Sequence, residues 1–181
     1  MIDYTVEPKS RNDLRELAEV FRKTLRLENS LYFPIVQMLD ILPEVFSDFS
    51  YEIVPDYVLP KQCHAQTDIK TGHITIKESV YDGACSGNGR DRMTIAHEIG
   101  HYFMLCVQGF KLQRNFSNAV PSYKNPEWQA KCFAGELMIP KKLVKNMNPF
   151  MIAKVCGVSS EAAFYQSKKY KGAWIYMLVK K

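Results

Sequence analysis

The residues best suited to chemistry form one short pentapeptide, His97-Glu98-Ile99-Gly100-His101. On a helix, His101 lies about 40° around the axis from His97 and roughly 6 Å further along, so both imidazoles can bind one ion. Two imidazoles suit Zn²⁺, which lowers the pKa of a bound water to about 7 and polarises a carbonyl. Glu98, about 100° from His97, lies beside that ion and can act as a general base. The pattern therefore indicates a zinc site that hydrolyses amide bonds. A buried helix that carries two histidines by chance is the alternative.

A catalytic zinc site needs a third protein ligand and an open fourth position. Glu127 is the first candidate, because it lies in the first turn of a helix that Asn125 and Pro126 are expected to begin. Small residues, Ala130 and Ala134, follow on the same stripe and allow close packing on the first helix. A glutamate in a first turn also stabilises the helix dipole without any metal, so other carboxylates stay open as third ligands. These are Glu136, Asp91 and Glu78.

The segment that carries the two histidines is expected to be an amphipathic helix from about residue 90 to residue 107, ending before Gly109. Its side opposite the histidines is apolar, with Ile95, Ile99, Phe103 and Cys106. Glu136 lies about 180° from Glu127 on the second helix, so these two carboxylates cannot both face the ion.

The rest of the chain supplies helices and a few strands around these two segments. A capping box at Ser10 and Asp13 predicts a helix over 11–26, and Pro34 opens a short helix that ends before Pro43. Further predictions are a strand over 51–54, a hairpin of 63–67 with 73–77, a loop or short helical turn over 78–89, and an irregular basic stretch over 111–124. The edge of the hairpin could bind an extended peptide.

Two more histidines, His64 and His73, belong to this hairpin and are interpreted as exposed residues rather than ligands. The C-terminal region predicts two helices around Gly157, followed by a terminal strand over 173–179. A helix-turn-helix flanked by lysines suggests DNA binding, but an αα-hairpin that closes the core is the favoured interpretation. The lysines are Lys154, Lys168, Lys169 and Lys171.

Composition is that of an ordinary globular domain. The 181 residues are 46% hydrophobic and 24% charged, which favours one domain with a proper core. No apolar run is long enough for a membrane span, and the N-terminus does not resemble a signal peptide. The five scattered cysteines favour reduced thiols, so we expect a cytoplasmic protein. A net charge of +5 permits an acidic partner without requiring one.

Residues 90–101 and 127–140 together resemble the ImmA/IrrE family of metallopeptidases, which are gluzincin-like zinc peptidases. A weaker match covers 152–163, so the resemblance extends over roughly 70–170. It implies an α+β, zincin-like peptidase domain with a small antiparallel sheet, an active-site helix and a C-terminal helical segment. By the family pattern, His97, His101 and Glu127 bind zinc, and Glu98 is the catalytic acid and base.

The resemblance also implies a biological role. Family members are typically intracellular, are often encoded on phages or mobile elements, and cleave a DNA-binding repressor, commonly from a neighbouring gene. One position departs from the family pattern, which usually has Asn or Asp four residues after the ligand glutamate. This chain has Lys131 there, and lysine cannot accept a hydrogen bond from a histidine N–H.

The sequence therefore predicts a zinc endopeptidase of regulatory type whose substrate is a helix-turn-helix repressor from the same mobile element or operon. Residues 1–140 are expected to form the peptidase domain, and 141–181 a helical segment and strand packed on it. Two alternatives stay open: a non-catalytic transcription regulator that binds DNA through 150–171, and an antirepressor that acts by protein binding. Tyr102 and Tyr123 are the candidates for stabilising an oxyanion.

Overall fold

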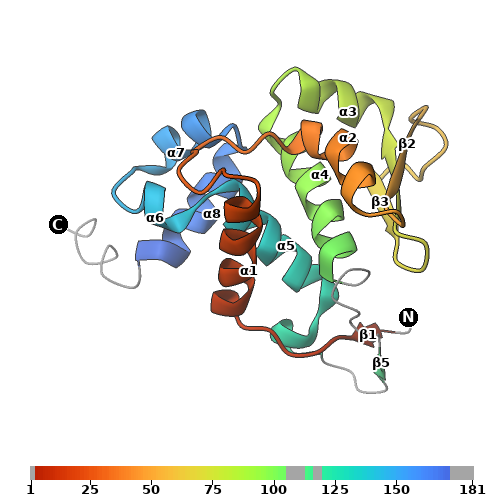
Figure 1. The fold of residues 1–181 in the computed structure, drawn as a ribbon, viewed down its shortest axis with the longest axis horizontal. Helices are drawn as coiled ribbons and strands as arrows, with labels where there is room; N and C mark the ends of the chain where they lie inside the picture. Colours follow the sequence, from red (N-terminus) through yellow and green to blue (C-terminus); the bar gives the residue numbers. More distant parts are fainter. Residues whose placement is uncertain (1–2, 105–112, 116–119, 172–181) are drawn as a thin grey trace.

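Two helices at the centre of the molecule carry the residues of interest. The computed structural model describes residues 3–104, 113–115 and 120–171. α4 (Gly89–Tyr102) and α5 (Pro126–Met138) pack against each other, and α1 (Arg11–Thr24) packs on α5. A small sheet lies on one side of this group and the C-terminal helices lie on the other (Figure 1). The fold is α+β and rich in helices, as predicted.

The sheet has three strands: β2 (Ser50–Val54), β3 (Ala65–Asp68) and β4 (His73–Lys77). Its order is β2-β4-β3, with β3 antiparallel to β4 as the hairpin pattern predicted. β2 runs parallel to β4, so the sheet is mixed and the expected antiparallel sheet is wrong in this respect. The chain between β2 and β4 makes a crossover through β3, which a local sequence pattern does not reveal. β3 lies at the edge, next to α4.

Apolar side chains join the sheet to the helices. Ile74 and Ile76 of β4 are fully buried, as are Ile95 and Ile99 of α4. α1 begins with the predicted capping box between Ser10 and Asp13. The apolar side of α4 therefore faces the core, which leaves the side that bears the histidines for chemistry.

Two helices differ from their predictions. α2 (Ile35–Val45) continues past Pro43 instead of ending before it. Its buried side chains Met38, Leu39 and Leu42 pack it on the core despite the hydrogen bond that the proline removes. α3 (Glu78–Cys85) is a full helix where a loop or short turn was expected. Its side chains Val80 and Ala84 are buried in the hydrophobic core, so this segment is held as a helix by packing.

Short elements complete the described chain: β1 (Asp3–Thr5), β5 (Gln113–Asn115), the 3₁₀ turn η2 (Ser122–Lys124), and the helices α6 (Lys141–Val144), α7 (Pro149–Cys156) and α8 (Ser160–Lys171). β1 pairs with β5, a contact that the sequence did not indicate. Gly157 ends α7 with φ of 63°, as the glycine predicted.

The C-terminal helices pack on the same core, since Ile152, Cys156 and Ala163 belong to it. The predicted boundary at 140/141 falls between α5 and α6 and stays a prediction. The predicted strand over 173–179 lies outside the described residues. Within the described chain, no helix is both long and apolar enough to cross a membrane.

Candidate metal centre

Close packing of α4 on α5 brings the candidate ligands together. A side chain at Gly100 would lie 3.2 Å from the carbonyl oxygen of Ala130 and 3.3 Å from the ring of Phe133. Ala130 and Ala134 are fully buried at this contact, as their size predicted. The small residues therefore let the first turn of α5 reach the histidines of α4.

Three possible ligand atoms converge where these helices meet. Nε2 of His97 lies 3.2 Å from one carboxylate oxygen of Glu127, and Nε2 of His101 lies 3.2 Å from the other. The two Nε2 atoms are 3.1 Å apart. Within the described residues, this is the only group of three or more His, Cys, Asp or Glu side chains that could hold a metal ion.

These separations fit a zinc ion. Zinc binds imidazole nitrogen and carboxylate oxygen at about 2.0–2.2 Å, so neighbouring ligands of a tetrahedral site lie about 3.3–3.5 Å apart. The separation of the two Nε2 atoms, 3.1 Å, and the 3.2 Å from each Nε2 to its own oxygen of Glu127 are only slightly shorter. With one ligand atom from each residue, the three atoms lie within 4.8 Å of one another.

The carboxylate of Glu127 is held in its charged form. Hydrogen bonds from the imidazoles of His101 and His97 lower the pKa of Glu127 far below its usual range, more than partial burial raises it. The side chain of Glu127 is 61% exposed, whereas those of His97 and His101 are 18% and 10% exposed. The site is therefore open to solvent on the side of α5, where a substrate could enter.

One imidazole nitrogen of the site has no partner. Nδ1 of His97 is buried and, among the described residues, makes no hydrogen bond. A histidine that binds a metal usually donates its second N–H to a carboxylate or carbonyl. Lys131, one turn after Glu127 on α5, is exposed and cannot accept such a bond.

The predicted general base, Glu98, is held by the sheet. The hydroxyl of Thr67 on β3 donates to a carboxylate oxygen of Glu98 at 2.7 Å, and it also lies 3.1 Å from the backbone oxygen of Glu98. Glu98 is only 8% exposed. The contact joins the edge strand to the helix that carries the candidate ligands.

Comparison with known families agrees with this geometry. Residues 66–166, more than half of the chain, match the Peptidase_M78 family, described as the IrrE N-terminal-like domain. The chain belongs to this family. The match contains α4, α5 and all four residues of the site.

Solved structures add evidence on the fold of this IrrE-like chain. A Mycobacterium tuberculosis transcriptional regulator superposes with a TM-score of 0.58 over 84% of the chain, at 14% sequence identity. The match covers 45% of that protein, so the IrrE-like chain spans less than half of its length. At this identity the likeness shows a shared fold. The curated protein sequences contain no match to the chain.

The structure separates the other candidate ligands from the site. Glu136 lies on the opposite side of α5, in a buried cluster with Arg11 and Arg15. His64 is exposed, as predicted. Nδ1 of His73 shares a hydrogen bond with the hydroxyl of Ser50. Neither Asp91 nor Glu78 joins the group of three.

Of the two candidate oxyanion groups, Tyr102 is buried and donates to Asp48 at 2.8 Å. It belongs to the aromatic core, with its ring 4.8 Å from that of Phe49. It therefore faces away from the reaction site, and that candidate is wrong. Tyr123 is 47% exposed just before α5 and stays a prediction. Thr67 could not be found from the sequence, because its contact with Glu98 depends on the packing of β3 on α4.

Proposed function

We propose that this IrrE-like chain is a zinc-dependent endopeptidase of regulatory type. The observation that carries the proposal is the convergence of His97, His101 and Glu127 at spacings that suit zinc, with the carboxylate of Glu98 on the same helix. Family membership supports a metal-dependent peptidase. The exposed side of Glu127 gives a protein substrate access.

The proposal assigns three roles to the residues of the site. His97, His101 and Glu127 would hold Zn²⁺ through Nε2, Nε2 and a carboxylate oxygen. When bound, zinc would polarise the scissile carbonyl and acidify the attacking water. Glu98 would accept the proton of that water and pass it to the leaving amine. Thr67 would keep the carboxylate of Glu98 in one orientation through its 2.7 Å hydrogen bond.

The edge strand offers a place for the substrate. No described strand pairs with the outer edge of β3, so its backbone groups can bind an extended peptide as an added strand. Thr67, which donates a hydrogen bond to Glu98, lies on this strand, so a peptide bound there would run close to Glu98. The proposed substrate is a helix-turn-helix repressor from the same mobile element or operon, and the proposed place of action is the cytoplasm.

The test combines metal content with cleavage. Purified parent protein, Glu98→Gln and the exposed control Glu16→Gln are supplied with zinc, and each is incubated with the neighbouring repressor. We expect about one zinc per chain in all three, and cleavage that falls roughly 10²- to 10⁴-fold only in Glu98→Gln. A parent protein that binds no zinc would refute the mechanism. A Glu98→Gln variant that still relieves repression fully would identify an antirepressor instead.

The C-terminal helices support a second candidate function. α7, the turn at Gly157 and α8 form a helix-turn-helix arrangement, and Lys168 and Lys169 are exposed on α8. A transcription regulator could bind DNA through this face. Salt-dependent DNA affinity that is lost in Lys168→Gln/Lys169→Gln, with zinc binding unchanged, would favour this function.

A further inference from the structure

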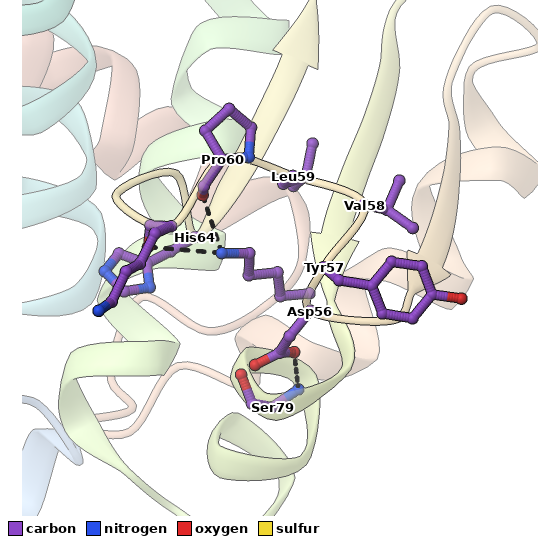
Figure 2. A pocket seen from close by; sticks show the side chains of 9 residues that line it. Asp56, Tyr57, Val58, Leu59, Pro60, His64 and Ser79 are labelled. Carbon is purple, nitrogen blue, oxygen red and sulfur yellow. Dashed lines mark hydrogen bonds between the residues drawn. The ribbon is translucent and has the colours of Figure 1, made fainter.

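A second polar site lies at the end of the edge strand, outside the candidate metal centre. It is a cavity of about 660 Å³ between the β2–β3 loop, the end of β4 and the start of α3 (Figure 2). Its lining includes the charged residues Asp56, Lys61 and Lys77, together with His64 and Tyr57. We call it the lysine pocket.

Lys77 is the central residue of the lysine pocket. It ends β4 and is only 5% exposed, although it carries a charge. Its ammonium donates to the backbone oxygen of Pro60 at 2.9 Å and lies 3.5 Å from that of Lys61. Within the described part of the chain it forms no ion pair with a carboxylate. A buried cation is normally paired with an anion, so this group is suited to receive one from a ligand.

The other residues leave an excess of positive charge. Asp56 is the one acidic side chain of the lysine pocket, and its carboxylate accepts the backbone N–H of Ser79 at 3.1 Å. It is thereby tied to the first turn of α3 (Figure 2). Lys61 and His64 are exposed at the opening, where an entering anion would meet them.

The position of the lysine pocket relates it to the candidate metal centre. His64 directly precedes β3, and its backbone oxygen accepts the N–H of Lys77 at 3.1 Å. Thr67, which contacts Glu98, lies three residues further along the same strand. At about 3.3 Å per residue, three residues of an extended peptide on β3 cover the roughly 10 Å of strand from Thr67, beside Glu98, to His64, at the lysine pocket.

From this arrangement we infer that the lysine pocket binds an acidic side chain of the substrate, about three residues from the scissile bond. The inference rests on the proposed peptidase function and adds the substrate class: an extended segment with Asp or Glu at a fixed position. The carboxylate would bind Lys77 and Lys61, while the backbone of the segment pairs with β3. A free small carboxylate has the same chemistry and is the competing occupant.

The test measures peptide binding without cleavage. A display library of random peptides is selected on the zinc-loaded Glu98→Gln protein. We expect selected peptides to share Asp or Glu at one position. A synthetic peptide with Gln at that position should bind about tenfold more weakly. Lys61→Glu should weaken the acidic peptide by a similar factor, whereas Lys23→Glu, an exposed lysine on α1, should not.

Lys61→Glu is preferred to Lys77→Met, because Lys77 also holds the β2–β3 loop. Selected peptides without an acidic preference, or equal binding by parent and Lys61→Glu, would overturn the inference. The inference would also be overturned if glutarate bound and no peptide were selected, because the lysine pocket would then bind a free anion. Acidic peptides that bind but are not cut by the Glu98 protein would refute the peptidase function and leave the lysine pocket standing.

Discussion

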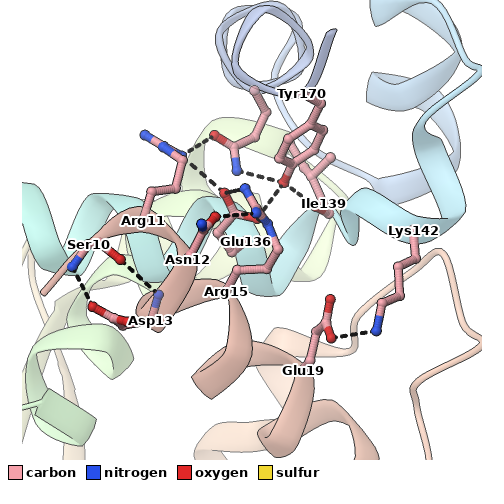
Figure 3. Close-up of polar contacts among 11 residues, drawn as sticks. Ser10, Arg11, Asn12, Asp13, Arg15, Glu19, Glu136, Ile139, Lys142 and Tyr170 are labelled. Atoms are coloured by element: carbon pink, nitrogen blue, oxygen red, sulfur yellow. Dashed lines mark hydrogen bonds and ion pairs between the residues drawn. The ribbon is translucent and has the colours of Figure 1, made fainter. Parts of the chain in front are cut away.

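Two glutamates at the two ends of α5 have opposite environments. Glu127, in the first turn, has a side chain that is 61% exposed and faces two imidazoles. Glu136, in the last turn, has a fully buried side chain with 3.1 and 2.9 Å ion pairs to Arg11 and Arg15. The hydroxyl of Tyr170 on α8 also donates to Glu136 at 3.0 Å (Figure 3).

The difference lies in the partners of each carboxylate. Guanidinium groups stay protonated at any ordinary pH, so the cluster around Glu136 is a closed set of charges that holds α1, α5 and α8 together. Imidazoles can release a proton and then offer a lone pair. The cluster around Glu127 is therefore an open set that a cation can complete. One helix thus carries a structural carboxylate and a candidate ligand. The sequence alone does not distinguish the two, because it does not reveal which glutamate is exposed.

The largest expected effect is on zinc affinity, which should depend on Glu127 and not on Glu136. Glu127→Ala removes one of three ligands, so we expect zinc affinity to fall roughly a thousandfold or more. Zinc content after dialysis, measured by atomic absorption, should fall from about one per chain to far below that. Because Glu127 is exposed, unfolding of the metal-free protein by urea should hardly change. Full zinc content in Glu127→Ala would remove Glu127 from the site.

The complementary change is Glu136→Ala, which should affect stability instead of metal binding. It leaves two largely buried guanidinium groups without their anion, and breaking a buried pair costs about 3–5 kcal/mol. Tm should therefore fall by roughly 10 °C. The protein that remains folded should still bind about one zinc. A variant with unchanged Tm would show that the cluster does not hold the helices together.

Alkaline pH should destabilise the protein through two buried thiols, one of which, Cys132, lies near Glu136 on α5. Burial raises the pKa of the thiols of Cys132 and Cys156 to about 11, above their ordinary value of 9.0. A raised folded-state pKa means that the stabilisation is present below pH 9 and is lost as the pH rises through 11. We expect a loss on the order of 2 kcal/mol per thiol, measured by urea unfolding between pH 8 and pH 11.

The control for this loss is substitution of single thiols. Cys132→Ala should make the alkaline decrease in unfolding free energy shallower, whereas Cys85→Ala, at an exposed position, should leave it unchanged. Equal slopes in all three proteins would show that the buried thiols do not titrate with unfolding.

Local patterns in the sequence predicted much of this molecule for physical reasons. The capping box at Ser10, the hairpin, the Asn125 cap and the glycine at the end of α7 each act over a few residues, so they can be recognised in the sequence. The pairing of β2 with β4 depends on segments far apart in the chain. The same is true of the contact between Thr67 and Glu98, which no local pattern encodes.

The candidate site shows the same limit. Helical periodicity placed His97 and His101 on one side of α4, but it left Glu127 and Glu136 as alternatives, because both could lie on a face of α5. The arginines of α1 decide between them by enclosing Glu136, and their position depends on how α1 packs. Family resemblance selected Glu127, and the close approach at Gly100 gives the physical reason.

The smallest expected effect concerns the unpaired Nδ1 of His97. Both carboxylate oxygens of Glu136 have partners, whereas Nδ1 of His97 has none among the described residues, so we expect an acceptor near His97 to improve the metal centre. Lys131 lies one turn after Glu127, at the position where the family pattern usually has Asn or Asp, so Lys131→Asp is the variant that tests this expectation. We expect about tenfold tighter zinc binding in competition with a chelator, since such acceptors contribute about 10- to 100-fold. Lys131→Ala is the control, because it removes the same positive charge without adding an acceptor. If both variants bind zinc equally, the gain comes from charge alone, and His97 needs no acceptor for its second nitrogen.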